Sequence, residues 1–319
     1  MSGADSKKVV IAALIGNLAI CACKFAAAYL SHSTATLAEA LHSVADTGNQ
    51  ALLLLGMRLA ARAADIRYPF GRSAEKYFWP FVVALLLFAV GGTFAIFEGV
   101  THVMHPSEVG SPFWSYAVLG VSTIFEMMSF RVAYGEFKKL ANGRPWAEFI
   151  LDARDPTIPL VLAEDASALV GLSIAFVAVF LTHLTGIRYF DPGGSILIGA
   201  LLCVVAIVLA TVTHGLLIGK GASIEDQAAV LELTEATNGV RRVTQLLTFH
   251  VGPDVVIVAM KVAFGERDQL GEVEDTINRI EERVRAALPH MRKIFIEPDS
   301  RGDGRGLEAA RAFLAARTT

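Results

Sequence analysis

The chain has 319 residues, of which 54% are hydrophobic and only 18% are charged, and its mean hydropathy is +0.50. Soluble globular proteins carry about 25% charged residues, so this composition argues against a wholly soluble protein and favours a lipid bilayer as the solvent for much of the chain. The formal net charge of −3 gives no reason to expect a nucleic-acid partner.

Six apolar segments are long enough to cross the hydrocarbon core of a bilayer, which takes about 20 residues in a helix. They are residues 9–30, 36–59, 78–103, 113–133, 158–181 and 195–217. Proline and glycine punctuate the connections between them, as in the run from Asp191 to Gly194 before the sixth segment. Residues 1–220 are therefore predicted to form a transmembrane bundle of six helices.

The distribution of lysine and arginine predicts the orientation of this bundle. Basic residues cluster between the second and third segments and between the fourth and fifth, at Arg62, Arg67, Arg72, Lys76, Lys138, Lys139, Arg144 and Arg154. The connections on the other side hold Arg188 alone. Both termini are therefore predicted to be cytoplasmic. The short loops and the lack of a targeting segment favour a bacterial plasma membrane.

Residues 221–300 read as a small α+β cytoplasmic domain. Helical periodicity covers 223–237 and 271–288, and strand patterns cover 239–251, 255–264 and 293–297. The order α-β-β-α-β predicts a sheet with helices on one face. The other face would be free to pair with a second copy, so the domain is expected to dimerise. Residues 301–319 form a charged tail with one short helix near 307–316.

The second segment carries polar residues where a lipid-facing helix would not. Glu39, His42, Asp46 and Asn49 are spaced three, four and three residues apart, which places them in one narrow stripe of the helix. An ionisable group in the bilayer core costs about 2.5–3.5 kcal/mol on insertion scales, so the stripe must line a cavity or face the interior of the bundle. His42 and Asp46 can bind one ion together. Imidazole with carboxylate suits zinc and neighbouring transition metals.

The fifth segment supplies two adjacent carboxylates, Glu164 and Asp165. Adjacent residues point about 100° apart on a helix, so both are not expected to reach one ion equally well. If Asp165 faces the bundle, the residue four positions earlier is Val161, which cannot bind metal. Glu164 then either completes the site by a longer reach or points to a neighbouring helix.

Two other interpretations stay open at this point. The polar stripe can be structural, in a membrane protein that transports nothing and uses its tail domain to bind a partner. Alternatively, a site with more carboxylate than imidazole can prefer Mn²⁺, Fe²⁺ or Co²⁺ to Zn²⁺.

Several motifs resemble those of the cation diffusion facilitators, a family of divalent metal transporters. The second segment, from Leu37 to Gln50, is similar to the family motif in which His or Asp precedes Asp by four residues. Two further motifs of the family are similar to stretches of this chain: the loop from Asp65 to Gly71, and Asp165 followed by Gly171. Gly252-Pro253 and the run from Ile296 to Pro298 are similar to the family's cytoplasmic domain. The match is best to the branch that contains the mitochondrial zinc exporter of animal cells and its bacterial relatives.

The resemblance implies a homodimeric transporter, not an enzyme, that exports Zn²⁺ by proton antiport with alternating access. It implies metal binding by His42, Asp46 and Asp165, with Val161 in place of the fourth ligand, so that Glu164, Glu39, Asn49 or a water completes the site. The family's loop histidine is Tyr68 here, and metal-sensing histidines of the tail are Met260 and Phe295. Accessory metal sites are therefore not expected.

Overall fold

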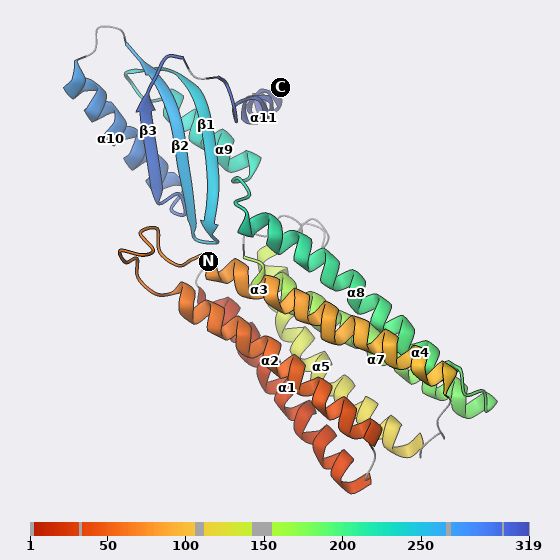
Figure 1. The fold of residues 1–319 in the computed structure, drawn as a ribbon. Helices are drawn as coiled ribbons and strands as arrows, with labels where there is room; N and C mark the ends of the chain where they lie inside the picture. The colour runs from red at the N-terminus through yellow and green to blue at the C-terminus, as the bar shows by residue number, and fades with distance from the viewer. Residues whose placement is uncertain are drawn as a thin grey trace. The chain divides into compact units, whose positions relative to one another are not determined.

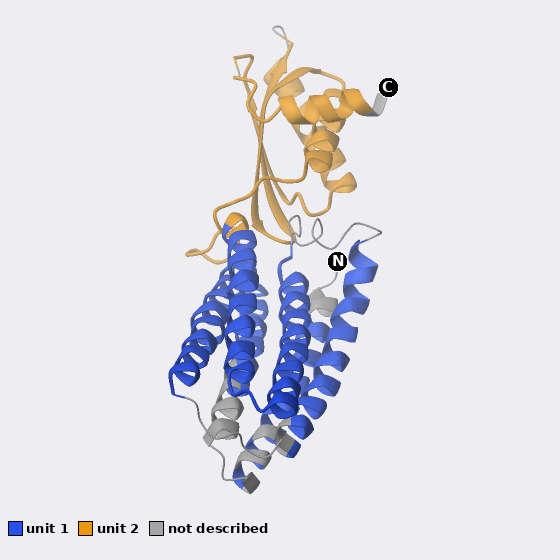
Figure 2. Cartoon of the chain, turned by 90° about the vertical axis from the view of Figure 1, so that its right-hand side faces the viewer, with its two compact units in different colours: residues 1–62, 75–214 blue, residues 63–74, 215–319 orange. Residues whose placement is uncertain are grey.

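The computed structural model describes residues 3–31, 34–105, 112–141, 155–265, 269–301 and 303–318; some side chains in these ranges, including those of residues 34–42, fall outside the description. The chain divides into two compact units (Figure 2). Unit 1 comprises Met1–Arg62 and Glu75–His214, and unit 2 comprises Ala63–Ala74 and Gly215–Thr319. The loop between the second and third predicted segments therefore belongs to the same unit as the C-terminal domain.

In its described residues, unit 1 consists of helices and the turns that connect them (Figure 1). Its elements are α1 (Gly3–Ser31), α2 (Thr34–Ala60), α3 (Glu75–Leu86), η1 (Leu87–Gly92), α4 (Thr93–Met104), α5 (Pro112–Ala141), α7 (Thr157–Thr185) and α8 (Phe190–Leu217). Among the described residues, four stretches are long and apolar enough to cross a membrane: Glu75–Met104, Tyr116–Ala141, Thr157–Thr185 and Phe190–Leu217. That α1 and α2 also span the membrane stays a prediction.

The third predicted segment is not one uniform helix. A single π-helical stretch, η1, separates α3 from α4 at Leu87–Gly92. Gly92 at its end lies against Gly199 of α8, where a Cβ on Gly199 would stand 2.7 Å from the Gly92 carbonyl oxygen. Close approach of this kind, made possible by small residues, is a common way for membrane helices to pack.

The core of unit 1 joins α1, α2, α5 and α7. The helix α1 packs against α2 and α5, and α5 packs against α7. Val10, Leu53 and Leu162 are buried in the shared apolar cluster, and Val161 is fully buried there. This packing brings one face of α2 and one face of α5 toward the first half of α7.

Unit 2 contains a three-stranded sheet with helices on one face. Its elements are α9 (Ile224–Glu235), β1 (Val240–Gly252), β2 (Val255–Phe264), α10 (Leu270–Ala287), β3 (Lys293–Pro298) and α11 (Glu308–Thr318). The strand order is β1-β2-β3, with β1 antiparallel and β3 parallel to β2. Alternate residues of β2, among them Val256, Val258 and Val262, are buried in one core with Ile280 of α10, as expected for a sheet covered on one side.

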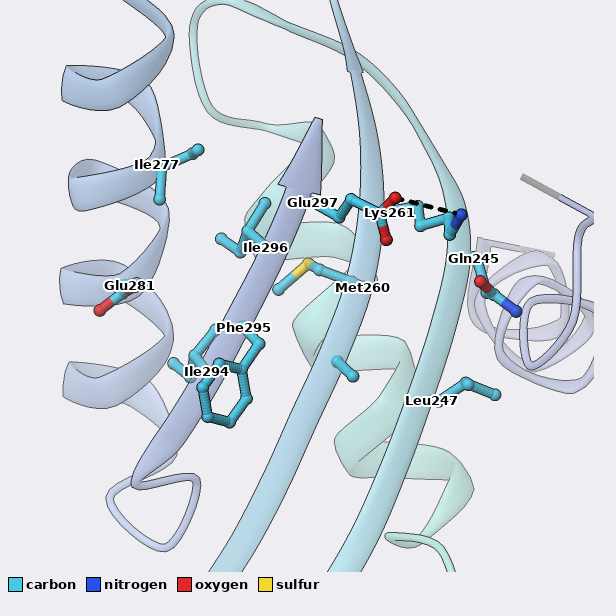
Figure 3. Close-up of a pocket in the computed structure, with 11 residues that line it drawn as sticks. Gln245, Leu247, Met260, Lys261, Ile277, Glu281, Ile294, Phe295, Ile296 and Glu297 are labelled. Carbon is cyan, nitrogen blue, oxygen red and sulfur yellow. Dashed lines mark ion pairs between the residues drawn. The ribbon is translucent and has the colours of Figure 1, made fainter. Parts of the chain in front are cut away.

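A pocket of about 450 Å³ extends from the uncovered face of the sheet around β3 to Ile277 and Glu281 of α10 (Figure 3). Lys261 on β2 forms ion pairs there with Glu297 at 3.4 Å and with Asp299 at 2.8 Å. Leu247 of β1 and Phe295 of β3 are exposed on this side. The face therefore combines apolar and charged groups.

The C-terminal segment is attached to unit 2 along the outer edge of β1. The Gly304 amide donates to the Thr244 carbonyl oxygen at 3.0 Å, and the Leu246 amide donates to the Arg305 carbonyl oxygen at 3.1 Å. Leu307 and Ala310 are buried in the unit's core. The sequence predicted a charged tail with one short helix; the structure places that helix, α11, against α9.

Candidate metal centre

The Glu164 carboxylate of α7 is held between two amide side chains of α2. Asn49 donates from Nδ2 to Oε1 of Glu164 at 3.3 Å, and Gln50 donates from Nε2 to Oε2 at 3.0 Å. All three residues are buried: their exposed fractions are 5% for Asn49, 0% for Gln50 and 9% for Glu164. Both oxygens of this carboxylate therefore face α2.

The neighbouring carboxylate, Asp165, points to a different helix. Ser129 of α5 donates from Oγ to Oδ2 of Asp165 at 2.7 Å, and Asp165 is 3% exposed. A buried carboxylate needs such partners because leaving it without hydrogen bonds would be costly. The pair on α7 is thus divided between α2 on one side and α5 on the other, as the angle between adjacent helical residues requires.

The described residues around this pair do not form a closed metal cluster. Among these residues, no group of three His, Cys, Asp or Glu side chains comes together in a way that could hold an ion. The carboxylates nevertheless share one region, since those of Asp46, Asp165 and Glu126 all repel that of Glu164. Carboxyl groups of three helices, α2, α5 and α7, therefore lie near one another in unit 1.

The structure allows a partial account of the predicted site residues. Asp46 is half-buried on α2, and its charge acts on Glu164. The Asn49 amide donates to Glu164 in this structure. Val161 is packed in the apolar core, which agrees with its having no role in binding metal. The side chains of Glu39 and His42 lie outside the described residues, so their part in the site stays a prediction.

Two residues of the site were not among those predicted to contact the ion. Gln50 lies four residues after Asp46, so the helical spacing that picked out the stripe could have included it. Ser129 lies three residues after Glu126 on α5 and seven after the buried Ser122. That polar face was a weaker signal, because serine occurs often within membrane helices as a partner of neighbouring helices.

Comparison with protein families supplies the classification of this bundle. Residues 10–217 match the model of the cation efflux transmembrane domain, which covers more than half of the chain. The chain belongs to the cation efflux family. Members of this family are membrane transporters of cations and not enzymes, so the resemblance seen in the sequence motifs is confirmed.

Individual relatives of this cation efflux protein come from animals, plants and bacteria. It is 32% identical over 82% of its length to the mitochondrial proton-coupled zinc antiporter SLC30A9 of Xenopus laevis, covering 47% of that protein. It is 33% identical over 78% of its length to metal tolerance protein C4 of Arabidopsis thaliana, covering 55%. The manganese efflux system protein MneS of Bacillus subtilis is 23% identical over 86% of the chain and 89% of its own length. The chain thus spans about half the length of the animal and plant relatives.

Proposed function

We propose that this protein is a secondary transporter that exports Zn²⁺ from the cytoplasm in exchange for protons. In this proposal α1 and α2 also span the membrane, which gives six spans with both termini in the cytoplasm of a bacterial cell. The protein acts as a homodimer, with unit 2 contributing to the contact between the two copies.

One observation carries the proposal: two buried carboxylates of α7 lie near the half-buried carboxylate of Asp46 on α2. Glu164 and Asp165 are both buried, and the charge of Asp46 reaches Glu164. Ionisable groups at membrane depth are retained mainly along ion and proton pathways. The names of the animal relatives, which are proton-coupled zinc antiporters, support zinc and protons as the pair of substrates.

Proton exchange follows from the chemistry of these ligands. A carboxylate or an imidazole must be without its extra proton to bind a metal ion, so Zn²⁺ and H⁺ compete for Asp46, Asp165 and His42. Histidine changes its charge near neutral pH, which suits this competition. A bound ion neutralises the carboxylates while the site is turned from one side of the membrane to the other. Protons that enter from the far side then release the metal.

In the proposed site, Asp46, Asp165 and His42 bind the ion directly. Because Asn49 and Gln50 occupy both oxygens of Glu164, we place Glu164 beside the ion and not among its first ligands. Completion of the site by Glu39 or a water remains consistent with this arrangement.

The described part of the site also favours manganese as a second candidate. Its ligands in this arrangement are carboxylate oxygens of Asp46 and Asp165, and oxygen ligands suit Mn²⁺. A manganese efflux protein is among the relatives. If His42 binds the ion, zinc is preferred; if the imidazole stays apart, the remaining oxygens favour manganese.

The test is transport by the purified full chain in liposomes. Wild-type protein and an Asp46→Ala variant would be compared for uptake of Zn²⁺ and Mn²⁺, read by an internal dye, with and without a pH gradient. We expect uptake that depends on the gradient in the wild type and is lost in the variant.

The matched control is Glu98→Gln, which removes a carboxylate from α4 outside the site and should transport as the wild type does. Absence of flux for Zn²⁺, Mn²⁺, Fe²⁺ and Co²⁺ by folded wild-type protein would overturn the proposal. That result would favour a structural role for the polar stripe.

A further inference from the structure

We infer that Glu164, Asn49 and Gln50 form a second binding point for the transported divalent cation, separate from the ion's position between Asp46 and Asp165. The inference rests on the proposed transport function and assigns a direct role to Gln50. Its basis is the arrangement of the three buried side chains between α2 and α7.

Gln50 has an unused hydrogen-bonding atom inside this cluster. Its Nε2 donates to Glu164, but its carbonyl oxygen Oε1 is fully buried and has no hydrogen-bond partner among the described residues. A buried acceptor without a partner is unfavourable, and such groups need an explanation. A cation that arrives beside Glu164 would give this oxygen a partner.

Rotation of each amide converts the cluster into a set of oxygen ligands. A carboxamide turned by 180° presents its oxygen where its nitrogen was, and the nitrogens of Gln50 and Asn49 now stand 3.0 and 3.3 Å from the Glu164 oxygens. Neighbouring ligands at right angles, with metal–oxygen bonds of about 2.1 Å, are about 3.0 Å apart. After rotation, the 3.0 Å spacing at Gln50 would match this separation of neighbouring ligands, and the 3.3 Å spacing at Asn49 would be slightly wider.

The cluster lies to one side of the Asp46–Asp165 pair. Gln50 follows Asp46 by four residues, which is about 6 Å along α2 toward its C-terminal end. Glu164 precedes Asp165 on α7, toward that helix's N-terminal end. At this end of unit 1, Lys76 at the start of α3 forms an ion pair with Asp155, just before α7. The distance from Nζ to Oδ2 is 3.6 Å. Both parts of the cluster thus lie toward the same end.

The position of the cluster and its single carboxylate suit a site that binds the ion briefly on its way through the protein. One carboxylate and two neutral amides carry a single negative charge, so they hold a divalent ion more weakly than a site with two carboxylates and an imidazole. A path through the membrane needs binding that is strong enough to admit the ion and weak enough to release it. In the proposed orientation, the ion stops at Glu164 on entry from the cytoplasm and then moves to Asp46 and Asp165.

The test is the dependence of Zn²⁺ flux on Zn²⁺ concentration in liposomes. Gln50→Met keeps the length of the side chain and removes its oxygen, and it should raise KM about tenfold with a maximal rate close to that of the wild type. Gln50→Glu adds a second carboxylate and should lower KM and slow release of the ion. The control is Thr213→Val, which removes a buried hydroxyl of α8 that bonds only within its own helix.

A KM for Gln50→Met within twofold of the wild type, or a lower maximal rate at unchanged KM, would overturn the inference and leave the amides as a structural link between α2 and α7. If Gln50→Met does not fold, Gln50→Glu decides, because an unchanged or higher KM contradicts a binding role. A wild type that carries no ion would refute the proposed function itself, which is a different result.

Discussion

The α7 carboxylates of unit 1 and the charged residues on the uncovered sheet face of unit 2 lie in opposite environments. In unit 1, Glu164 and Asp165 are buried and each is hydrogen-bonded to a side chain of another helix. In unit 2, Lys261 pairs with Glu297 and Asp299 on the open face of the sheet. Buried carboxylates are expensive to keep, whereas pairs at a surface contribute little either way.

The difference indicates which charged residues are present for a functional reason. Charges on the sheet of unit 2 can be exchanged with small effects because water solvates them. The buried carboxylates Glu164 and Asp165 of unit 1 are held by specific partners, so their presence needs a functional reason. The comparison predicts large effects on transport from the α7 carboxylates, intermediate effects on stability from packing, and small effects from the ion pairs of unit 2.

The largest effect is expected from Asp165→Asn, which keeps the size of the side chain and removes its charge. Because the proposed ion loses a charged ligand, the initial rate of Zn²⁺ flux in liposomes should fall by roughly a hundredfold or more. Ser129→Ala removes only the hydroxyl that orients Asp165, and flux should then fall roughly tenfold. Equal effects of the two substitutions would show that Asp165 acts through its contact with α5 alone.

Packing in the core of unit 2 should give the next effect. Ile280 on α10 is fully buried, so Ile280→Ala should destabilise this unit by about 2–5 kcal/mol through lost burial and a cavity. Hydrogen exchange of β2 amides in the full chain would measure the loss. Leu270→Ala on the same helix is the control, because Leu270 is 84% exposed; similar acceleration in both variants would refute the assigned core.

The close contact of α8 with η1 should give a smaller effect. A Cβ on Gly199 would stand 2.7 Å from the Gly92 carbonyl oxygen and 2.7 Å from Cγ1 of Ile96. Gly199→Ala should therefore lower stability by about 1–3 kcal/mol through overpacking, seen as a lower Tm in detergent. Gly120→Ala on α5 is the matched change, since nothing lies within 4 Å of that position. An unchanged Tm for both variants would show that α8 and η1 can move apart without loss of stability.

The smallest effect is expected from the ion pair of Lys261 with Asp299. The Lys261 ammonium, and then the Arg301 amide, lower the pKa of Asp299 below its usual range. A lowered pKa contributes stability above the unfolded value of about 3.9, and this contribution is lost as the pH falls through the folded value. The hydrogen bond from Lys261 to Asp299 raises the pKa of Lys261, so its own contribution is lost only as the pH rises through that higher value.

Replacement of Lys261 by Met should raise the pKa of Asp299 only in part, because the Arg301 amide remains. An NMR titration of the carboxylates would measure this change. Asp303 is the internal control, since its lowered pKa is due chiefly to Arg305. A shift at Asp303 of the same size would mean that the substitution disturbs the whole C-terminal segment.

Much of the fold could be predicted from periodicity. The β-branched run of β2 predicted a strand at 255–264, where the structure has it, and Ser223 caps α9 at the predicted start of that helix. The π-helical η1 could not be predicted, because a continuous apolar run carries no sign of a local change in hydrogen bonding. The attachment of the C-terminal segment to β1 depends on backbone contacts of residues 304–306, which hydrophobicity does not encode.

The site was predictable to the extent that helical spacing determines it. Spacing placed Asn49 on the stripe of α2, and the angle between adjacent residues allowed Glu164 to face a neighbouring helix, as it does. The roles of Gln50 and Ser129 depend on how α2, α5 and α7 pack, and spacing within one helix does not contain that information. Whether Glu39 and His42 complete the site stays a prediction from the sequence.

The most direct test of the account is simultaneous measurement of Zn²⁺ and protons in the same liposomes, with one internal dye for each. The account predicts that Zn²⁺ entry is accompanied by proton exit in the wild type and that both fluxes vanish in the Asp46→Ala/Asp165→Asn double variant. Zn²⁺ flux of normal size in that double variant, with the protein folded, would contradict it.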